Sequence, residues 1–272
     1  MTTSVSFDPS KATERFYTMV KSLSEFDKLE VRGVIDTLLS KTGRDHCFIG
    51  TYYRSVANIG TLLGLKSPKH FQAIAMLARG LFELAVDIRL IDVIPDGSAK
   101  MIAFSDVEKL RCARKIVRFT AANPNASVDS TIYSSFVADN GQRIDNEQGT
   151  VWPNLKNKRV SHWSGRDLAS RVAILKSPFD KIYEVNYPQL SWQVHSGLTG
   201  IINLQAATFT LMCGVAFKLA ADSYWESLLT MIREFKIGKA TAKIEEKLKA
   251  AKMLPFTDTP EQAEQLLREL LQ

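Results

Sequence analysis

The stretch of residues 183–218 carries the most information about the fold and reads Y-E-V-N-Y-P-Q-L-S-W-Q-V-H-S-G-L-T-G-I-I-N-L-Q-A-A-T-F-T-L-M-C-G-V-A-F-K. Its second half, residues 196–217, is 22 residues long and carries no charge. A helix without a polar face must be covered by other helices, because its apolar side chains have no side to turn toward water. The first half carries polar side chains at steps of four, namely Tyr183, Tyr187, Ser191 and His195. A polar row at the start of a buried helix must be hydrogen-bonded or functional.

The composition is that of an ordinary globular protein. The chain has 272 residues, of which 45% are hydrophobic and 24% are charged, as in soluble domains. The formal net charge of +6 comes from 35 basic and 29 acidic residues. This surplus permits an anionic partner such as RNA or a nucleotide, although a solvated basic surface is the simpler explanation. Charge alone therefore leaves both interpretations open.

The cysteines indicate a reducing compartment. Cys47, Cys112 and Cys213 are isolated, and no C-x-x-C pair occurs. The polar start M-T-T-S-V-S-F-D-P does not have the pattern of a signal peptide, so we expect a cytoplasmic protein without disulfides. His46 beside Cys47 is the only close His/Cys pair in the sequence. Nothing at ligand spacing completes that pair, so neither a metal nor a cofactor is predicted.

The charge-free run raises the question of a membrane span. A span needs about 20 apolar residues, and the run is long enough. However, it contains Asn203, Gln205 and three threonines, and no strongly basic flank marks one end. The central helix of a bundle explains the run better, so we expect no membrane association.

Apolar residues recur at helical spacing along the rest of the chain. The pattern predicts helices over 9–22, 24–39, 47–64, 68–94, 105–119, 166–175, 222–237 and 260–271, with another beginning at Ser177-Pro178. Either Ser98 or Ser105 could open the helix that ends near 119, and Gly43 is the expected stop of the second helix. No internal repeat and few alternating strand patterns occur. The sequence therefore predicts an all-α protein, a multi-helix bundle around a buried apolar central helix.

The C-terminal part differs in character. Residues 238–252 are rich in lysine, Leu254-Pro255 interrupts the helical pattern, and Thr259-Pro260-Glu261-Gln262 forms a capping box for a last helix. We therefore expect a helical bundle domain over residues 1–237 and a basic helical appendage over residues 238–272.

Residues 139–165 read as a long loop. They open with Asp139-Asn140-Gly141 and contain isolated aromatic residues without a period. Loops of this length within a domain are usually lids or binding segments. The stretch ends in the cluster His162-Trp163-Ser164-Gly165, in which Ser164 is the expected cap of the next helix.

A basic run marks the helix that precedes this loop, with Lys109, Arg111, Arg114, Lys115 and Arg118. Such a run is usually a solvated face, and a phosphate-binding surface is the alternative.

Arg79 and Glu83 form the first candidate site. They lie one turn apart on the predicted helix 68–94, in a narrow polar stripe with Gln72 and Asp87. Apolar residues crowd this stripe, so part of it is expected to be buried. Each charge would then need a partner, because a lone buried charge is costly. Such a pair either fixes helix packing or serves a function.

The second candidate site combines His162 with the row from Tyr183 to His195. Pro188 is expected to begin a new helix within this row and to spoil its strict alignment. A neutral imidazole at residue 195 can donate one hydrogen bond and accept another. The alternatives are a hydrogen-bonded core histidine and a functional group.

Taken together, these motifs resemble a poorly characterised bacterial all-helical family, a domain of unknown function. The resemblance rests on A-R-G-L-F-E-L-A at 78–85, H-W-S-G at 162–165 and the polar row at 183–195, and it spans roughly residues 50–220. It implies a helical bundle with one shared polar centre, made of Arg79, Glu83, His162, Ser191 and His195. No activity comes with it.

The chain is more loosely similar to HEPN-type helical domains, many of which are ribonucleases in defence or toxin systems. Their hallmark is an arginine, four residues and then a histidine on one helix. Here the positions five residues before the four histidines hold Lys41, Leu65, Asn157 and Leu190. No histidine has the required arginine, so Arg79 would have to supply the cation from another helix.

The sequence allows two functional hypotheses. In the first, a cytoplasmic protein binds RNA or a nucleotide, with or without hydrolysing it, in a bacterial defence or toxin context. A histidine would act as general acid or base and Arg79 would stabilise developing negative charge. The catalytic candidates are His195, Arg79, Glu83 and His162, and the binding candidates are Tyr183, Tyr187, Ser191 and Trp163.

The second hypothesis is a non-catalytic interaction module. In it the polar centre fixes helix register, and residues 238–272 bind a protein partner or another copy of the chain, which gives a homo-oligomer.

Overall fold

The structure, a computed structural model, describes residues 8–38, 42–155, 159–194, 206–238 and 241–253. Over these ranges the chain is an all-α multi-helix bundle, as predicted, and contains no strand. In chain order the elements are α1 (Pro9–Phe26), the π-helix η1 (Asp27–Val31), α2 (Arg32–Asp36), α3 (Gly43–Leu63), the 3-10 helix η2 (Pro68–His70), α4 (Phe71–Val93), α5 (Gly97–Ala122), α6 (Thr131–Val151), the 3-10 helix η3 (Pro153–Leu155), α7 (Leu168–Leu175), α8 (Phe179–Val185), α9 (Tyr187–Val194), α10 (Ala206–Glu234) and α11 (Thr241–Met253).

The chain divides into two compact units. The first combines residues 1–89 with residues 172–272, and the second is the continuous segment 90–171. This division differs from the predicted boundary between residues 237 and 238. The described part of the lysine-rich segment forms α11, which packs against α1 and α10 of the first unit. The predicted helix over 260–271 lies outside the described residues.

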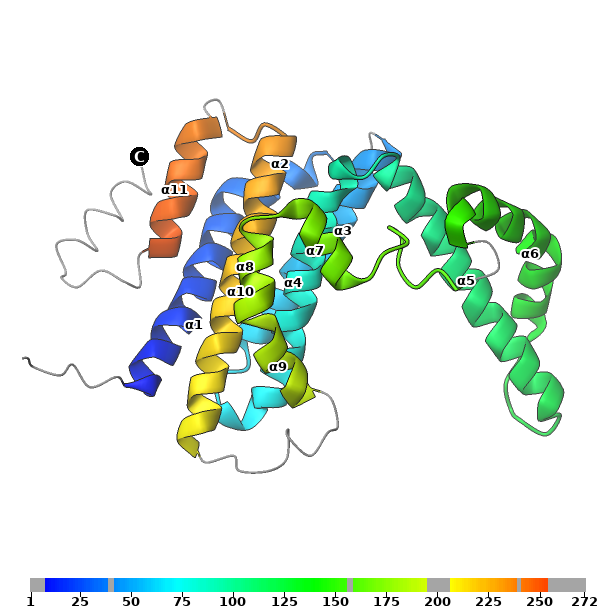
Figure 1. The fold of residues 1–272 in the computed structure, drawn as a ribbon, viewed down its shortest axis with the longest axis horizontal. Coiled ribbons are helices and arrows are strands. Elements are labelled where there is room, and N and C mark those ends of the chain that lie inside the picture. The colour runs from blue at the N-terminus through cyan, green and yellow to red at the C-terminus, as the bar shows by residue number, and fades with distance from the viewer. Residues whose placement is uncertain (1–7, 39–41, 156–158, 195–205, 239–240, 254–272) are drawn as a thin grey trace, which may run out of the picture. The chain divides into compact units, whose positions relative to one another are not determined.

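The first unit is built around α1 and α10, which lie side by side (Figure 1). The Oγ1 atom of Thr13 donates a hydrogen bond of 2.7 Å to the carbonyl of Thr210, and further along both helices the ring of Tyr17 meets the edge of Phe217. Contacts that advance along both helices together show that the two run parallel. The buried face of α10 includes Ala216, Leu219, Ala220, Tyr224 and Leu228, each 0% exposed. The end of the predicted central helix forms the start of α10, which continues without a break through most of the segment predicted as a separate helix over 222–237. Residues 196–205 of the charge-free run lie outside the described residues.

The N-terminal helices begin as predicted but end differently. Asp8 caps α1 by accepting hydrogen bonds from the amides of Ser10 and Lys11, and Pro9 takes the first helical position. The segment predicted as a second helix is divided among the end of α1, the π-helical η1 and the short α2. Gly43 was predicted to end a helix, and this was wrong. The side chain of Thr42 accepts a hydrogen bond from the amide of Asp45 and caps α3, which places Gly43 at the first position of that helix.

The second unit corrects the predicted long loop, because α6 continues through residue 151. The misleading turn signal was Asp139-Asn140-Gly141. Gly141 is buried against α5, where a Cβ atom would lie 3.3 Å from the guanidinium of Arg114 and 3.8 Å from Leu110. The glycine therefore allows close helix packing and does not make a turn.

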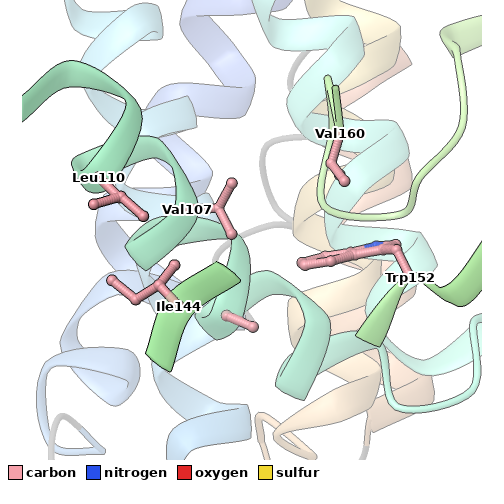
Figure 2. Close-up of a cluster of buried hydrophobic side chains, with 6 residues drawn as sticks. Val107, Leu110, Ile144, Trp152 and Val160 are labelled. Carbon is pink, nitrogen blue, oxygen red and sulfur yellow. The ribbon is translucent and has the colours of Figure 1, made fainter. Parts of the chain in front are cut away.

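The core of this unit forms between α5, α6 and the chain that follows α6. Figure 2 shows Val107, Leu110 and Ile144 close together, with Trp152 and Val160 at the other end of the cluster. The indole Nε1 of Trp152 donates a hydrogen bond of 2.9 Å to the carbonyl of Trp163. This bond ties the residues after α6 to the core.

Within the described ranges, no helix has both the length and the apolar character that crossing a membrane requires.

Candidate functional site

Arg79 and Glu83 lie one turn apart on α4, and Tyr187 at the start of α9 joins them. The NH2 group of Arg79 donates a hydrogen bond of 2.9 Å to the hydroxyl of Tyr187, which in turn donates one of 3.0 Å to Oε1 of Glu83. The two charged side chains are thus linked through a phenol and not by a direct ion pair. We call Arg79, Glu83 and Tyr187 the Arg79 centre.

Tyr187 holds the guanidinium in a fixed orientation. The Cζ atom of Arg79 lies 4.9 Å from the centroid of the Tyr187 ring, a cation–π contact. Burial raises the pKa of Tyr187, the hydrogen bond from Arg79 lowers it, and the charge of Glu83 raises it. The net shift is upward, so Tyr187 is a neutral hydrogen-bond donor at neutral pH. It orients Arg79 and does not act as a base.

Arg79 keeps unused hydrogen-bonding capacity. Its side chain is half-buried, and its Nε atom is buried without a hydrogen-bond partner among the described residues. A guanidinium has five N–H donors and no acceptor. A buried donor without a partner costs about 1–3 kcal/mol, and such a group calls for an explanation such as a bound water or ligand.

Aromatic rings stack beside the guanidinium. Tyr183 on α8 is stacked on Tyr187, with centroids 5.3 Å apart and planes inclined by 28°. Tyr183 is also stacked on Phe82 of α4 at 6.3 Å. Phe82 is fully buried, whereas Tyr183 is only half-buried. The expectation that part of the polar stripe on α4 is buried is confirmed, since Arg79, Glu83 and Asp87 are all half-buried.

The rest of the predicted row is only partly described. Ser191 lies one turn after Tyr187 on α9 and is half-buried. Pro188 is the second residue of that helix, so the predicted helix start at this point is confirmed. His195 lies outside the described residues, and its candidate role as a catalytic residue stays a prediction.

His162 belongs to the second unit, where it is held on both sides of its ring. Its Nδ1 lies 2.8 Å from Oγ of Ser164, and its Nε2 lies 3.0 Å from NH1 of Arg171, a residue only 5% exposed. Because a guanidinium can only donate, Nε2 is the acceptor in the contact with Arg171. The backbone amide of Ser164 donates a hydrogen bond of 3.2 Å to Nδ1, so both ring nitrogens of His162 are engaged within the second unit.

The contacts at both ring nitrogens hold the imidazole of His162 in place. Trp163 is also enclosed, since it is 3% exposed and its indole nitrogen is buried. The predicted helix cap also needs correction. Asp167 accepts a hydrogen bond of 2.8 Å from the amide of Ser170 at the start of α7, and this bond lowers the pKa of Asp167. Ser164 accepts only from the amide of Arg166, before the helix.

The basic run on α5 is largely compensated by nearby acids. Arg114 forms a bidentate pair with Asp145 at 2.9 and 2.7 Å, which raises the pKa of Arg114. Lys109 lies 3.1 Å from Asp106, and Arg111 pairs with Glu108. This favours the solvated-face interpretation of the run.

The sequence did not point to a second polar centre in the first unit. Asp27 is 0% exposed within η1, and its carboxylate accepts hydrogen bonds from the hydroxyl of Tyr52 and from Arg32, the latter at 2.5 Å. Burial lowers the pKa of Arg32, but the hydrogen bond and charge of Asp27 outweigh it and the pKa is raised. The hydroxyl of Tyr224 is buried nearby without a hydrogen-bond partner among the described residues. We call these four residues the Asp27 centre.

One signal for this centre was present. Asp27 follows the apolar residue Phe26 directly, and the π-helical turn η1 places its side chain in the interior. Such π-helical turns are frequent at functional sites.

The described residues contain no group of three or more His, Cys, Asp or Glu side chains that could hold a metal ion. Comparison with known proteins finds no matching family model, no matching curated protein and no matching solved structure. Any functional conclusion therefore rests on the geometry of the chain itself.

Proposed function

We propose that the Arg79 centre binds a phosphate group of RNA or of a nucleotide. The observation that carries the proposal is the guanidinium of Arg79, which Tyr187 holds in place while the Nε–H remains without a partner. Arginine is the residue best suited to phosphate oxygens, because its planar donors match their geometry.

The aromatic stack suggests how a base would be held. Stacking of a base on an aromatic side chain contributes about 1–3 kcal/mol and tolerates any base. The half-buried ring of Tyr183, next to the ring under Arg79, offers such a surface. In the proposed complex the phosphate contacts Arg79 and the base stacks on Tyr183.

Glu83 has an orienting role in this proposal. It accepts the only proton of the Tyr187 hydroxyl, so that the oxygen presents a lone pair to Arg79. It also neutralises much of the charge of Arg79, which favours moderate affinity over tight, purely electrostatic binding. Hydrolysis would further require a histidine, and His195 is the candidate, since both ring nitrogens of His162 are engaged.

Binding is tested by titrating a fluorescently labelled oligoribonucleotide and 5′-AMP into the wild type, Arg79→Gln and Arg89→Gln. Arg89 is the matched control, because it lies on the same helix and is exposed. We expect Arg79→Gln to weaken binding at least tenfold and Arg89→Gln to leave it within twofold. Equal binding by all three proteins, or no binding by the wild type, would contradict the proposal and leave the centre a packing device.

Hydrolysis is tested separately with the same oligoribonucleotide. We expect any cleavage to be lost in His195→Ala and retained in His162→Asn, after both variants are shown to melt cooperatively.

One observation favours an interaction module as a second function, although through a different surface from the predicted one. Lys247 pairs with Glu30 at 3.1 Å and Lys252 with Asp222 at 2.8 Å, so these lysines of α11 are used within the first unit. In the second unit, large apolar side chains are exposed around the turn between α5 and α6. They are Phe119 at 53%, Val128 at 45% and Ile132 at 77%.

Exposed apolar clusters of this kind often mark protein interfaces. We propose that this turn pairs with the same turn of a second copy of the chain. Light scattering after size exclusion is expected to show a dimer for the wild type and a monomer for Ile132→Ser. An exclusively monomeric wild type would rule out this function.

A further inference from the structure

A cavity of about 550 Å³ lies in the first unit between α1 and α10 and shares no lining residue with the Arg79 centre. One wall is a single face of α1, and the facing wall belongs to α10, including Phe217. The chain between α3 and α4 contributes Lys66. Pockets for small molecules usually have volumes of about 300–1,000 Å³, so the cavity is large enough for a ligand the size of a short peptide.

The walls of the cavity are held at fixed positions. The hydroxyl of Thr13 donates a hydrogen bond to the carbonyl of Thr210. If residue 214 had a Cβ atom, that atom would lie only 2.8 Å from the Thr13 hydroxyl oxygen. The two helices thus meet closely at Thr13 and Gly214. The hydroxyl of Tyr17 donates a hydrogen bond of 2.9 Å to the carbonyl of Leu63, which fixes its ring against Phe217. The aromatic surface of the cavity is therefore preformed.

The cavity also presents charges of both signs. The ammonium of Lys66 lies 5.1 Å from the centroid of the Tyr17 ring, and Lys66 forms no ion pair with the described residues. Glu14 lies one turn before Tyr17 on the same face of α1 and likewise has no ion pair within the described ranges. Lys21 lies one turn beyond Tyr17 and reaches Glu25 only at 3.8 Å, with both side chains largely exposed. An uncompensated cation and an uncompensated anion thus flank an aromatic surface.

We propose that this cavity binds a small zwitterion of the short-peptide class. The ligand carboxylate would pair with Lys66, its ammonium with Glu14, and an apolar side chain would lie on Tyr17 and Phe217. A ligand carrying only negative charge would meet repulsion from Glu14, and an uncharged apolar ligand would gain nothing from either charge.

The experiment is isothermal titration calorimetry of the full chain with the dipeptide leucyl-phenylalanine. The same dipeptide with an acetylated amino group and with an amidated carboxyl group serves as a pair of blocked probes. We expect the free dipeptide to bind with millimolar or tighter affinity and each blocked form to bind at least tenfold more weakly. Undetectable binding of the free dipeptide, or equal binding of a blocked form, would overturn the proposal.

Two variants assign the charges to the residues. Lys66→Met is expected to bind the free dipeptide at least tenfold more weakly and to lose the preference for it over the amidated form. Glu14→Gln is expected to lose the preference over the acetylated form. Both side chains are exposed, as are those of the matched controls Lys69→Met and Glu246→Gln, which should bind as the wild type does. Unchanged binding by Lys66→Met and Glu14→Gln would place the ligand elsewhere and refute the assignment.

Discussion

The Asp27 centre and the Arg79 centre contain the same chemical groups, a carboxylate, a guanidinium and a tyrosine hydroxyl, in different orders. In the Asp27 centre both the hydroxyl of Tyr52 and the guanidinium of Arg32 donate to a fully buried carboxylate. In the Arg79 centre the hydroxyl of Tyr187 stands between the two charges, and both charged side chains are half-buried.

This difference separates a packing device from a binding site. A buried carboxylate that is paired and hydrogen-bonded locks the helices that supply its partners, here η1, α2 and α3, and removing one partner leaves an uncompensated charge. A half-buried guanidinium keeps contact with water and can exchange that water for a ligand. We therefore expect the two centres to respond differently to matched substitutions.

The largest effect is expected for Asp27→Ala. This change leaves Arg32 without its carboxylate and should lower the free energy of unfolding by about 3–5 kcal/mol, measured by denaturant unfolding. Asp36→Ala is the matched control, because exposed Asp36 accepts a hydrogen bond from Tyr53 and should lose less than about 1 kcal/mol. Similar losses in the two variants would show that burial of Asp27 does not set the cost.

The same change of tyrosine to phenylalanine can be made in both centres. Tyr52→Phe removes a hydrogen bond to a buried carboxylate and should cost about 1.5–3 kcal/mol. Tyr187→Phe leaves Arg79 and Glu83 near water, which can replace the lost hydroxyl, so the cost should be about 0.5–1.5 kcal/mol. Thermal and denaturant unfolding of both variants gives the comparison, and an equal or reversed order would contradict it.

The two centres are also expected to respond differently to alkaline pH. Burial raises the pKa of Tyr52, and the charge of Asp27 adds a smaller rise in the same direction. The folded state therefore keeps a proton that the unfolded state loses above pH of about 10. The stabilisation from this proton is complete below that pH and is lost as the pH rises, by about 1.4 kcal/mol per pH unit.

The free energy of unfolding, measured between pH 10 and pH 11, should accordingly fall less steeply with pH in Tyr52→Phe than in the wild type. Tyr187→Phe should change the slope less, because Arg79 partly offsets the rise in the pKa of Tyr187. Identical slopes for Tyr52→Phe and the wild type would mean that Tyr52 does not retain its proton.

The smallest effect is expected for Tyr224→Phe. The Tyr224 hydroxyl is buried without a partner among the described residues, and burial, together with the charges of Asp27 and Tyr52, raises its pKa. Removing an unsatisfied hydroxyl should leave the free energy of unfolding unchanged or raise it by up to about 1 kcal/mol. A loss above 1 kcal/mol would instead place a hydrogen bond between Tyr224 and Asp27.

The sequence predicted the fold class and, of the two centres, most of the Arg79 centre. Apolar periodicity located α3, α4 and α10, because burial on one helix face leaves a local trace in the sequence. It also identified Arg79 and Glu83, since two charges in a crowded apolar helix are visible at a spacing of four. Tyr187 was singled out for its place in a polar row, but its position between the two charges depends on how α9 meets α4.

The Asp27 centre could not be predicted in the same way. Its members come from η1, α2, α3 and α10, and a π-helical turn brings Asp27 inward. The helical end of α6 was missed because Gly141 was interpreted from its neighbours Asp139 and Asn140, whereas its role is set by Arg114 and Leu110 on another helix. Contacts between residues distant in the sequence decided both cases.

The division of the chain has a consequence for how the protein is made. The second unit is one continuous segment, 90–171, whereas the first unit needs residues from both sides of it. During synthesis the ribosome releases every residue of the second unit before α10 exists, and domains tend to fold as they emerge. Helices α1 and α3 must therefore wait for α10, against which both of them pack. Slow translation or a stalled ribosome between residues 172 and 206 would prolong the stage at which the nascent chain depends most on chaperones.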